Sequence, residues 1–474
     1  MKAKLDIISA SQIEALHDAT LELLATTGVT INSEEALQIL GDAGADVSNS
    51  NHVKIPVRLI EEALKNTKKN IILFTREGKP YIHLDGSMSY FGAIPDCPDI
   101  LDPYSHKRRQ TTLADVSSLT RLVDFLPNLT WIMTTGTIRN IPPLISDRVS
   151  FMQAVLNTSK PVGCAINNVE SLKSMIEICT IISGGLQKLS SHPFFYCSVE
   201  PITPLVHGKD AVEKSLFCAE NGIPNVIYSM PMAGATSPAT FAGTLVVSNA
   251  EFLSHLVIVQ LKKPGSPVIY GSMPNIMDMK TSIYPYGSPE LGLLTACLTA
   301  VSHYYGLPMW GTAGVTDAKV IGTQAGLELM YECILSLQTG ADFIHDIGFM
   351  DHATMISPEL IVLMDEIIDM VKVSMKGIEI NKETIALKLI DSVGPGGSYI
   401  DELHTLKHFR DFWVPSVLDR SRLVAESSKS TMHCEDLVNE KTKEILENHF
   451  PCPLPDDIVK EIQSMEKSWY KEYA

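Results

Sequence analysis

The feature that most constrains this chain is a series of short apolar runs, each ending in small or polar residues and followed by helical sequence. Strands that alternate with helices favour parallel pairing. A set of eight such strands favours a closed (β/α)8 barrel of the α/β class, in which site residues lie at the carboxyl ends of the strands. The eight runs are 88–92, 130–136, 161–166, 194–200, 225–230, 267–272, 308–311 and 341–348.

A barrel of this kind takes about 250 residues, whereas the chain has 474. We therefore predict three parts: a cap of helices and a small sheet over 1–85, the TIM barrel over 86–375 and a helical extension over 376–474. No Ser- or Gly-rich linker follows the first part. The cap is thus expected to pack on the barrel rather than swing freely.

The charge balance argues against nucleic acid as a partner, because 38 Lys and Arg face 55 Asp and Glu, a net charge of −17, and phosphate binding needs basic patches. The N-terminus lacks the apolar core of a signal peptide. The most apolar span, Leu245–Leu261, is interrupted by Asn249, Glu251 and His255. We expect a cytoplasmic protein without a membrane partner, whose nine scattered cysteines are free thiols.

Four stretches carry a family pattern. The longest, 394–420, reads GPGGSYIDELHTLKHFRDFWVPSVLDR; the others are LDPYSHKRRQTTLADVSSLTRLVDFL (101–126), SPELGLLTACLTAVSHYYGLP (288–308) and GVTDAKVIGTQAGLE (314–328). Together they resemble the trimethylamine methyltransferase superfamily, the corrinoid-protein methyltransferases of methylated amines. The resemblance implies a TIM barrel that passes a methyl group from an amine to the cobalt of a separate corrinoid protein.

The trimethylamine branch of that family carries pyrrolysine in its barrel, whereas every residue here is one of the standard twenty. The resemblance therefore implies the non-pyrrolysine branch, which is similar to enzymes acting on glycine betaine, proline betaine or carnitine. A quaternary ammonium leaves as a neutral amine, so no acid has to protonate nitrogen, and the protein's task is desolvation and orientation. The implied cofactor is methylcobalamin/cob(I)alamin on the partner, with none bound tightly here. We also expect a homo-oligomer.

Titratable residues at predicted strand ends are the candidate catalytic groups. His345 ends the eighth run beside Asp346; because neighbours in a strand face opposite sides, only one of them should point into the barrel. Glu200 ends the fourth run, where its carboxylate either faces a substrate cation or holds a histidine; the alternative is a pair with an outer Lys or Arg. Asp317 follows the seventh run and either belongs to the site or caps the next helix. For His345 the alternative is a structural histidine.

A quaternary ammonium offers no hydrogen-bond donor, so aromatic faces and carboxylates recognise it, each contributing about 0.5–2 kcal/mol. Aromatic residues on or beside the predicted barrel mouth are therefore candidates for substrate binding, with core packing as the alternative for each. They are Tyr90, Phe91, Trp310, Tyr284 and Tyr286.

The remaining candidates are charged or thioether side chains. Asp346 is a further substrate-binding candidate, and Arg139 is the candidate partner for a betaine carboxylate, with Arg108 or Arg109 as substitutes and surface solvation as the alternative. Methionines offer an adaptable apolar surface for a corrin ring. The candidates for that contact are Met230, Met273 and Met277.

His404 and His408 lie four residues apart, on one helix face, as zinc ligands can. No third ligand lies nearby in the sequence and no H-E-x-x-H pattern occurs, so we expect helix packing and predict no metal ligands. Two other functions stay open: a zinc- or other metal-dependent methyltransferase on a TIM barrel, and a barrel that binds quaternary amines without catalysis.

Overall fold

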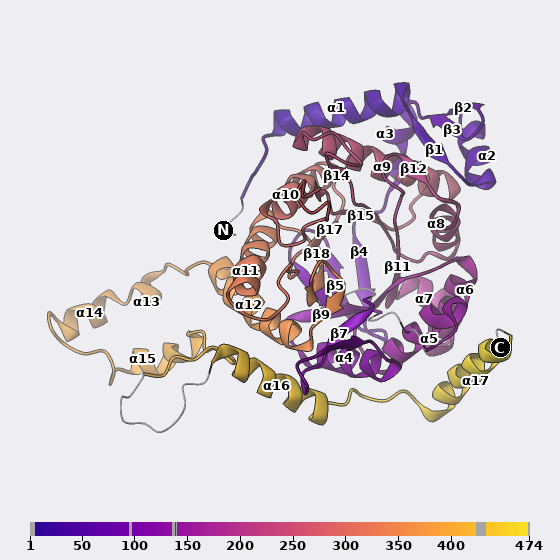
Figure 1. Ribbon diagram of the computed structural model, residues 1–474. Helices are drawn as coiled ribbons and strands as arrows, with labels where there is room; N and C mark the ends of the chain where they lie inside the picture. The colour runs from indigo at the N-terminus through magenta and orange to yellow at the C-terminus, as the bar shows by residue number, and fades with distance from the viewer. Residues whose placement is uncertain (1–4, 94–96, 135–137, 139, 423–432, 473–474) are drawn as a thin grey trace.

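The computed structural model describes residues 5–93, 97–134, 138, 140–422 and 433–472. Its centre is a closed barrel of eight parallel strands (Figure 1). Each strand overlaps one predicted run; residues 135 and 136 of the second run lie outside the described residues. The predicted (β/α)8 barrel is therefore confirmed. In order around the barrel the strands are β6 (Tyr90–Ala93), β9 (Leu129–Met133), β10 (Val162–Ala165), β11 (Phe195–Val199), β13 (Asn225–Ser229), β15 (Val268–Ser272), β17 (Met309–Thr312) and β18 (Phe343–Ile347).

Helices surround the barrel on its outside, as a ring in Figure 1. Local sequence sets their starts: the helix at 289, for example, follows Ser288 as N-cap residue and begins with a proline and an acidic residue in its first turn, which suits the helix dipole. The helices are α4 (Leu113–Phe125), α5 (Pro143–Leu156), α6 (Val169–Ser183), α7 (Leu186–Ser191), α8 (Lys209–Asn221), α9 (Phe241–Lys262), α10 (Pro289–Tyr304), α11 (Thr323–Thr339) and α12 (Pro358–Lys376).

Helix α9 is long and apolar enough to cross a membrane by length and composition, yet 78% of its apolar window is buried inside the protein. It packs against α8 and β13 of the barrel and against helices of the N-terminal part. Its buried residues include Asn249, Glu251 and His255. These contacts make α9 the core helix that joins the barrel to the N-terminal part.

The N-terminal part joins the barrel through a shared sheet, because β1 pairs in parallel with the short strand β12 (Val206–His207) of a barrel loop. Three of its helices also contact α9. The predicted boundaries at residues 85 and 375 stay a prediction. The elements are α1 (Ala10–Thr26), β1 (Val29–Ile31), α2 (Glu34–Asp42), β2 (Asp46–Asn49), β3 (His52–Lys54), α3 (Val57–Asn66), β4 (Ile71–Phe74) and β5 (Pro80–Leu84).

The chain beyond α12 first leaves the barrel and then returns to it (Figure 1). Residues 377–414, which we call the arm, hold α13 (Lys382–Ile385), α14 (Leu387–Val393), α15 (Leu403–His408) and the 3-10 helix η1 (Phe409–Asp411). Helix α16 (Cys434–Asn448) then packs against α12 and α4, and α17 (Asp456–Glu472) against α5 and α6.

Short strands lie at the carboxyl end of the barrel. They belong to the segments that follow barrel strands in the chain, and each such segment leaves the barrel at that end. One sheet joins segments that follow β6 and β18, and a second pair joins segments that follow β13 and β15. The mouth of the barrel is thus built from four of the strand–helix loops. The covering strands are β7 (Asp99–Leu101), β8 (Arg108–Gln110), β14 (Met232–Ala233), β16 (Asn275–Ile276), β19 (Phe349–Met350) and β20 (Met355–Ile356).

Candidate functional site

Large aromatic side chains fill the barrel interior below the mouth, on the side toward the amino-terminal ends of the strands. Trp131 lies 4.3 Å from Phe343 between ring centroids, and Tyr196 lies 5.1 Å from the same ring. The neighbouring strands carry glycine where these rings pass: a Cβ on Gly92 would lie 2.1 Å from Trp131, and one on Gly163 would lie 2.2 Å from Tyr196. The barrel is therefore packed here, between the mouth at the carboxyl ends of the strands and a cavity of about 600 Å³ at their amino-terminal ends, which Ser89, Pro308 and Asp342 help to line.

The next layer holds Trp310, His345 and Tyr228. Trp310 stacks on His345 with ring centroids 3.2 Å apart, and Tyr228 lies 4.9 Å from Trp310. Gly271 pairs with both Tyr228 and Trp310 in the strand register. A Cβ there would lie 2.6 Å from the Tyr228 Cβ, so the glycine lets the two rings meet across β15.

His345 and Asp346 both face the barrel interior, and the prediction that only one would do so is wrong. Asp346 has a φ of +77°, and the pairing of β18 with β6 shifts register between Ile344 and Ile347. This irregularity interrupts the alternation of side chains, as a bulge does. The Asp346 carboxylate accepts a 2.8 Å hydrogen bond from the Thr312 hydroxyl, and its other oxygen lies 2.5 Å from His345 Nδ1.

The His345 imidazole is fully buried. Burial lowers its pKa, while the neighbouring Asp346 carboxylate acts in the opposite direction. Among the described residues, neither ring nitrogen has a partner with hydrogen-bond geometry, despite the short distance to Asp346. Nε2 is therefore a buried ring nitrogen without a partner among the described residues, and such atoms are rare in folded proteins.

Glu200 directly follows β11, is exposed at the molecular surface and lines an open cavity of about 340 Å³ at the mouth, together with Met230 and Met232. The surrounding protein desolvates the carboxyl group and raises its pKa, and a hydrogen bond from the Tyr228 hydroxyl opposes this rise. Behind it, Glu251 is buried and accepts hydrogen bonds from the Thr203 hydroxyl and the Leu205 amide. Burial raises the pKa of Glu251 to about 7.

The loop between β15 and α10 brings two tyrosines to the same mouth. Tyr284 and Tyr286 have ring centroids 4.7 Å apart, and the Tyr284 hydroxyl donates to the Met273 carbonyl at 2.6 Å. Burial raises the pKa of both phenols, and the nearby Asp346 and Glu200 carboxylates raise them further. Two tyrosines and two carboxylates from three loops and strands thus lie near one another, and we call these four residues the mouth cluster.

Asp317 fixes the position of this tyrosine loop. Its carboxylate accepts hydrogen bonds from the backbone amides of Tyr286 and Gly287, each at 3.0 Å, and lies 2.9 Å from His352 Nδ1. The alternative that it caps the following helix is wrong, because α11 begins at Thr323 after Gly322. Asp317 therefore acts on the mouth through the backbone it holds.

Two of the aromatic candidates lie away from the mouth. Phe91 faces outward, where the Lys372 ammonium lies 6.0 Å from its ring centroid. Tyr90 pairs with Phe343 and faces inward, but it stands at the first residue of β6, at the opposite end of the strand from the mouth. Their expected contact with a substrate at the mouth is therefore not supported by their placement.

The other candidates have mixed placements. Met230 lines the Glu200 cavity, Met273 is buried and Met277 is half-buried in the loop that carries the tyrosines. Arg139 lies outside the described residues. Arg108 and Arg109, the other candidates for a betaine carboxylate, both form ion pairs within the protein.

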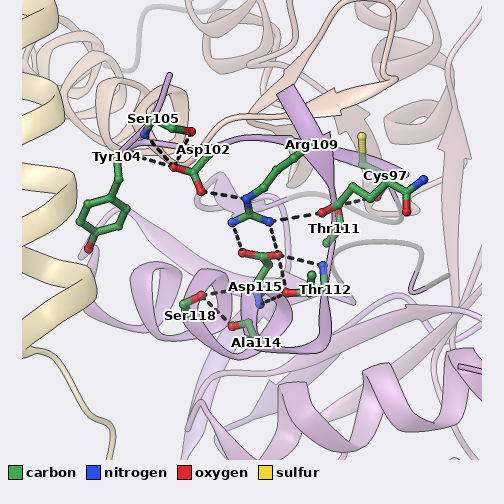
Figure 2. A network of polar contacts seen from close by, with 11 residues as sticks. Cys97, Asp102, Tyr104, Ser105, Arg109, Thr111, Thr112, Ala114, Asp115 and Ser118 are labelled. Atoms are coloured by element: carbon green, nitrogen blue, oxygen red, sulfur yellow. Dashed lines mark hydrogen bonds and ion pairs between the residues drawn. The ribbon is translucent and has the colours of Figure 1, made fainter. Parts of the chain in front are cut away.

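Figure 2 shows how Arg109 is held. Its guanidinium donates to Asp102 at 2.8 Å and to both oxygens of Asp115 at 2.7 and 2.8 Å. Arg108 likewise contacts Asp99 and Asp351, each at 2.7 Å. These pairs fasten the β7–β8 hairpin to α4 and to the segment after β18, so their charge is already balanced by protein carboxylates.

The sequence interpretation missed Tyr228 and Glu332. Tyr228 had a signal, since it lies in the run 225–230 at an inward position near the strand end. Glu332 had none: it lies within α11, where its Oε2 accepts hydrogen bonds from the Gly314 and Val315 amides at 2.9 and 3.1 Å. Burial raises its pKa well above the ordinary value, and its two accepted hydrogen bonds support the loop after β17.

Comparison with known proteins agrees with this architecture. The sequence model of the trimethylamine methyltransferase (MTTB) family matches residues 1–468. The chain is 34% identical to trimethylamine methyltransferase MttB of Desulfitobacterium hafniense (strain DSM 10664 / DCB-2), over 98% of this chain and 94% of that protein. It is 29% identical to a glycine betaine methyltransferase of D. hafniense (strain Y51), over 97% of this chain and 96% of that protein.

A solved structure shares the fold. The monomethylamine methyltransferase MtmB of Methanosarcina barkeri aligns with a TM-score of 0.51 at 13% identity, covering 94% of this chain and 88% of that one. At this identity the likeness concerns the fold alone. The match of the family sequence model over nearly the whole length decides the relationship: the chain belongs to the trimethylamine methyltransferase (MTTB) family.

Proposed function

We propose that this methyltransferase moves a methyl group from a betaine-type quaternary amine to the Co(I) of a corrinoid carried by a separate protein. The observation that carries the proposal is that Glu200 and Asp346 of the mouth cluster lie near enough to Tyr228, Tyr284 and Tyr286 to act on the pKa of each phenol. The similarity to a glycine betaine methyltransferase supports the substrate class.

The mouth cluster suits a cation that has no hydrogen-bond donor. Aromatic faces attract such a cation through their quadrupole, by about 0.5–2 kcal/mol each when desolvated. Trp310 and Tyr228 present adjoining rings, and Glu200 supplies a negative charge. The carboxylates offset the cost of bringing the cation out of water, and the rings hold its methyl groups without competing hydrogen bonds.

His345 acts in this proposal as a positioning residue rather than as an acid. A quaternary ammonium leaves as a neutral tertiary amine when its carbon–nitrogen electron pair stays on nitrogen, so no proton is required. The imidazole supports the Trp310 plane by stacking, and burial, which lowers its pKa, disfavours a positive charge that would repel the substrate. Asp317 keeps the tyrosines in place.

The corrinoid partner supplies a nucleophilic cobalt that accepts the methyl group. The rim fits a flat apolar ring: Met230 and Met232 line the cavity, and Met279 is 68% exposed in the neighbouring loop. Flexible thioether side chains adapt to such a surface. Cytoplasmic location, a homo-oligomeric state and the absence of a tightly bound cofactor stay predictions.

Incubation with free cob(I)alamin and single amines tests the proposal. Glycine betaine, proline betaine and carnitine are the quaternary substrates, trimethylamine is the tertiary control, and methylcobalamin absorbance is the readout. Methyl transfer from a quaternary amine and not from trimethylamine would support the proposal, whereas transfer from trimethylamine alone would contradict it. Binding of a betaine without transfer, also with added corrinoid proteins, would favour the non-catalytic barrel.

A further inference from the structure

The arm, residues 377–414, has no core of its own. None of the residues in α13, α14, α15 or η1 is buried, and large apolar side chains such as Ile380 and Leu403 are 77% and 81% exposed. In Figure 1 the arm projects from the end of α12 away from the barrel. Helices this short do not hold their shape without tertiary support, and small units of this kind are often cross-linked by a metal ion.

The fold brings a third metal-ligating side chain to the two histidines of the arm. Glu383 of α13 joins His404 and His408 of α15, and one ligand atom of each lies within 4.8 Å of the others. The His408 Nε2 atom is 3.0 Å from Glu383 Oε1, and the two imidazole centroids are 4.4 Å apart. The sequence spacing supplied only the two histidines, because Glu383 lies on the preceding helix.

Two further observations indicate a ligand at this place. His404 Nε2 is buried and has no hydrogen-bond partner among the described residues, a costly state unless its lone pair is used. His408 Nδ1 lies 3.2 Å from Asp411 Oδ2. Metal-binding histidines usually contact a carboxylate through the nitrogen that does not bind the metal, and this contact leaves Nε2 directed to the cluster.

We propose that Glu383, His404 and His408 bind one zinc ion, which joins α13 to α15 and fixes the arm. Two imidazoles and a carboxylate are a ligand set that zinc accepts, with water in the fourth position. Lys407 Nζ also contacts Glu383, so this ammonium competes with the ion for the carboxylate. The site is separate from the barrel mouth and has a structural role, so it is independent of the proposed methyl transfer.

Metal titration of the full-length protein tests the site. After dialysis against a chelator, Co²⁺ is added as a spectroscopic probe and Zn²⁺ as competitor, and bound metal is counted by mass spectrometry. We expect one saturable site per chain with tetrahedral Co²⁺ absorption bands. Glu383→Gln, His404→Ala and His408→Ala should each lose it, and His83→Ala, which removes an exposed imidazole of β5, should retain it.

Two variants separate a metal site from a mere ion-pair cluster. Lys407→Met removes the competing ammonium and should tighten Co²⁺ binding, although it breaks an ion pair. Asp411→Asn should weaken binding by about tenfold, the lower end for loss of such a supporting carboxylate. Equal Co²⁺ binding by wild type and His404→Ala, no saturable binding by wild type, or weaker binding by Lys407→Met would each overturn the proposal.

Limited proteolysis supplies a readout that does not depend on spectroscopy. The turn at 394–397 lies between α14 and α15 and carries exposed glycines. Zn²⁺ should slow cleavage within the arm of the wild-type protein and leave the rate unchanged in His408→Ala. If Zn²⁺ protects both proteins equally, the ion acts elsewhere and the arm site is refuted, whatever the methyltransferase activity shows.

Discussion

Trp310 lies parallel to His345, with ring centroids 3.2 Å apart and an angle of 16° between the ring planes. The two residues are on adjacent strands, where Trp310 pairs with Phe343 and Thr312 pairs with His345. The stack therefore crosses the barrel layer diagonally and leaves the indole in contact with Tyr228. In the proposed site this indole is the best cation-binding surface, because indole has the strongest quadrupole of the aromatic side chains.

Replacing Trp310 by Leu should lower kcat/KM for the betaine by about 30-fold, which corresponds to about 2 kcal/mol of cation–π attraction. The side chain remains apolar, so the barrel should stay folded. Steady-state methyl transfer to cob(I)alamin measures the effect. Trp310→Phe retains a ring face and should lose much less; equal losses in both variants would mean that Trp310 acts by packing and not by binding the cation.

Glu200→Gln should weaken betaine binding and change its pH dependence. The pKa of Glu200 is raised by desolvation, so the wild-type carboxylate loses its charge, and the site its attraction for a cation, as pH falls through a value above the ordinary 4.5. The variant has no such titration and should show a flat acid limb. kcat/KM profiles measure this, with Glu62→Gln, which changes an exposed residue of α3, as control; an unchanged acid limb in Glu200→Gln would exclude Glu200.

Asp317→Ala should raise KM more than it lowers the stability of the barrel. The change removes the acceptor for the Tyr286 and Gly287 amides and frees the loop that carries both tyrosines. Asp278→Ala is a matched control, because Asp278 accepts amide hydrogen bonds at the exposed end of the same loop. Similar KM values for the two variants would show that Asp317 has no special part in positioning the tyrosines.

The barrel could be predicted from the sequence because each strand is a separate apolar run, and the same runs locate the strand ends. Whether a given side chain points into or out of the barrel depends on strand register, which the apolar pattern does not encode. Phe91 and Tyr90 lie in a run that is buried on both faces, so the sequence does not distinguish its inner from its outer side. Their placement away from the mouth follows from the pairing of β6 with β18.

The Tyr228–Trp310 contact shows what pattern alone leaves out. It requires Gly271 on the strand between them, and a glycine in an apolar run marks a bulge or a tight bend as often as a close side-chain approach. Asp346 is a second case, because its left-handed backbone, with φ +77°, reverses the direction that strand alternation predicts. Glu383 is a third, since its approach to His404 and His408 depends on how α13 and α15 pack.

The last prediction concerns the joint between the cap and the barrel, where two histidines are buried. His207 of β12 and His255 of α9 face each other with Nδ1 atoms 3.2 Å apart, and their outer nitrogens contact the Ser254 and Ser215 hydroxyls at 2.8 and 2.9 Å. Burial lowers the pKa of His207 to about 4. Burial also lowers the pKa of His255, with His207 as a further cause.

Acid should therefore destabilise the protein through this pair. Below the unfolded pKa of about 6.5 the unfolded chain binds protons that the folded chain excludes, so the free energy of unfolding rises with pH. The stabilisation is complete above that pKa and is lost as pH falls toward 4; for His207 it is on the order of 3 kcal/mol. Urea unfolding at several pH values should show a shallower acid slope for His207→Gln than for wild type or His83→Ala, and equal slopes in all three would mean that the pair takes up protons without unfolding the joint.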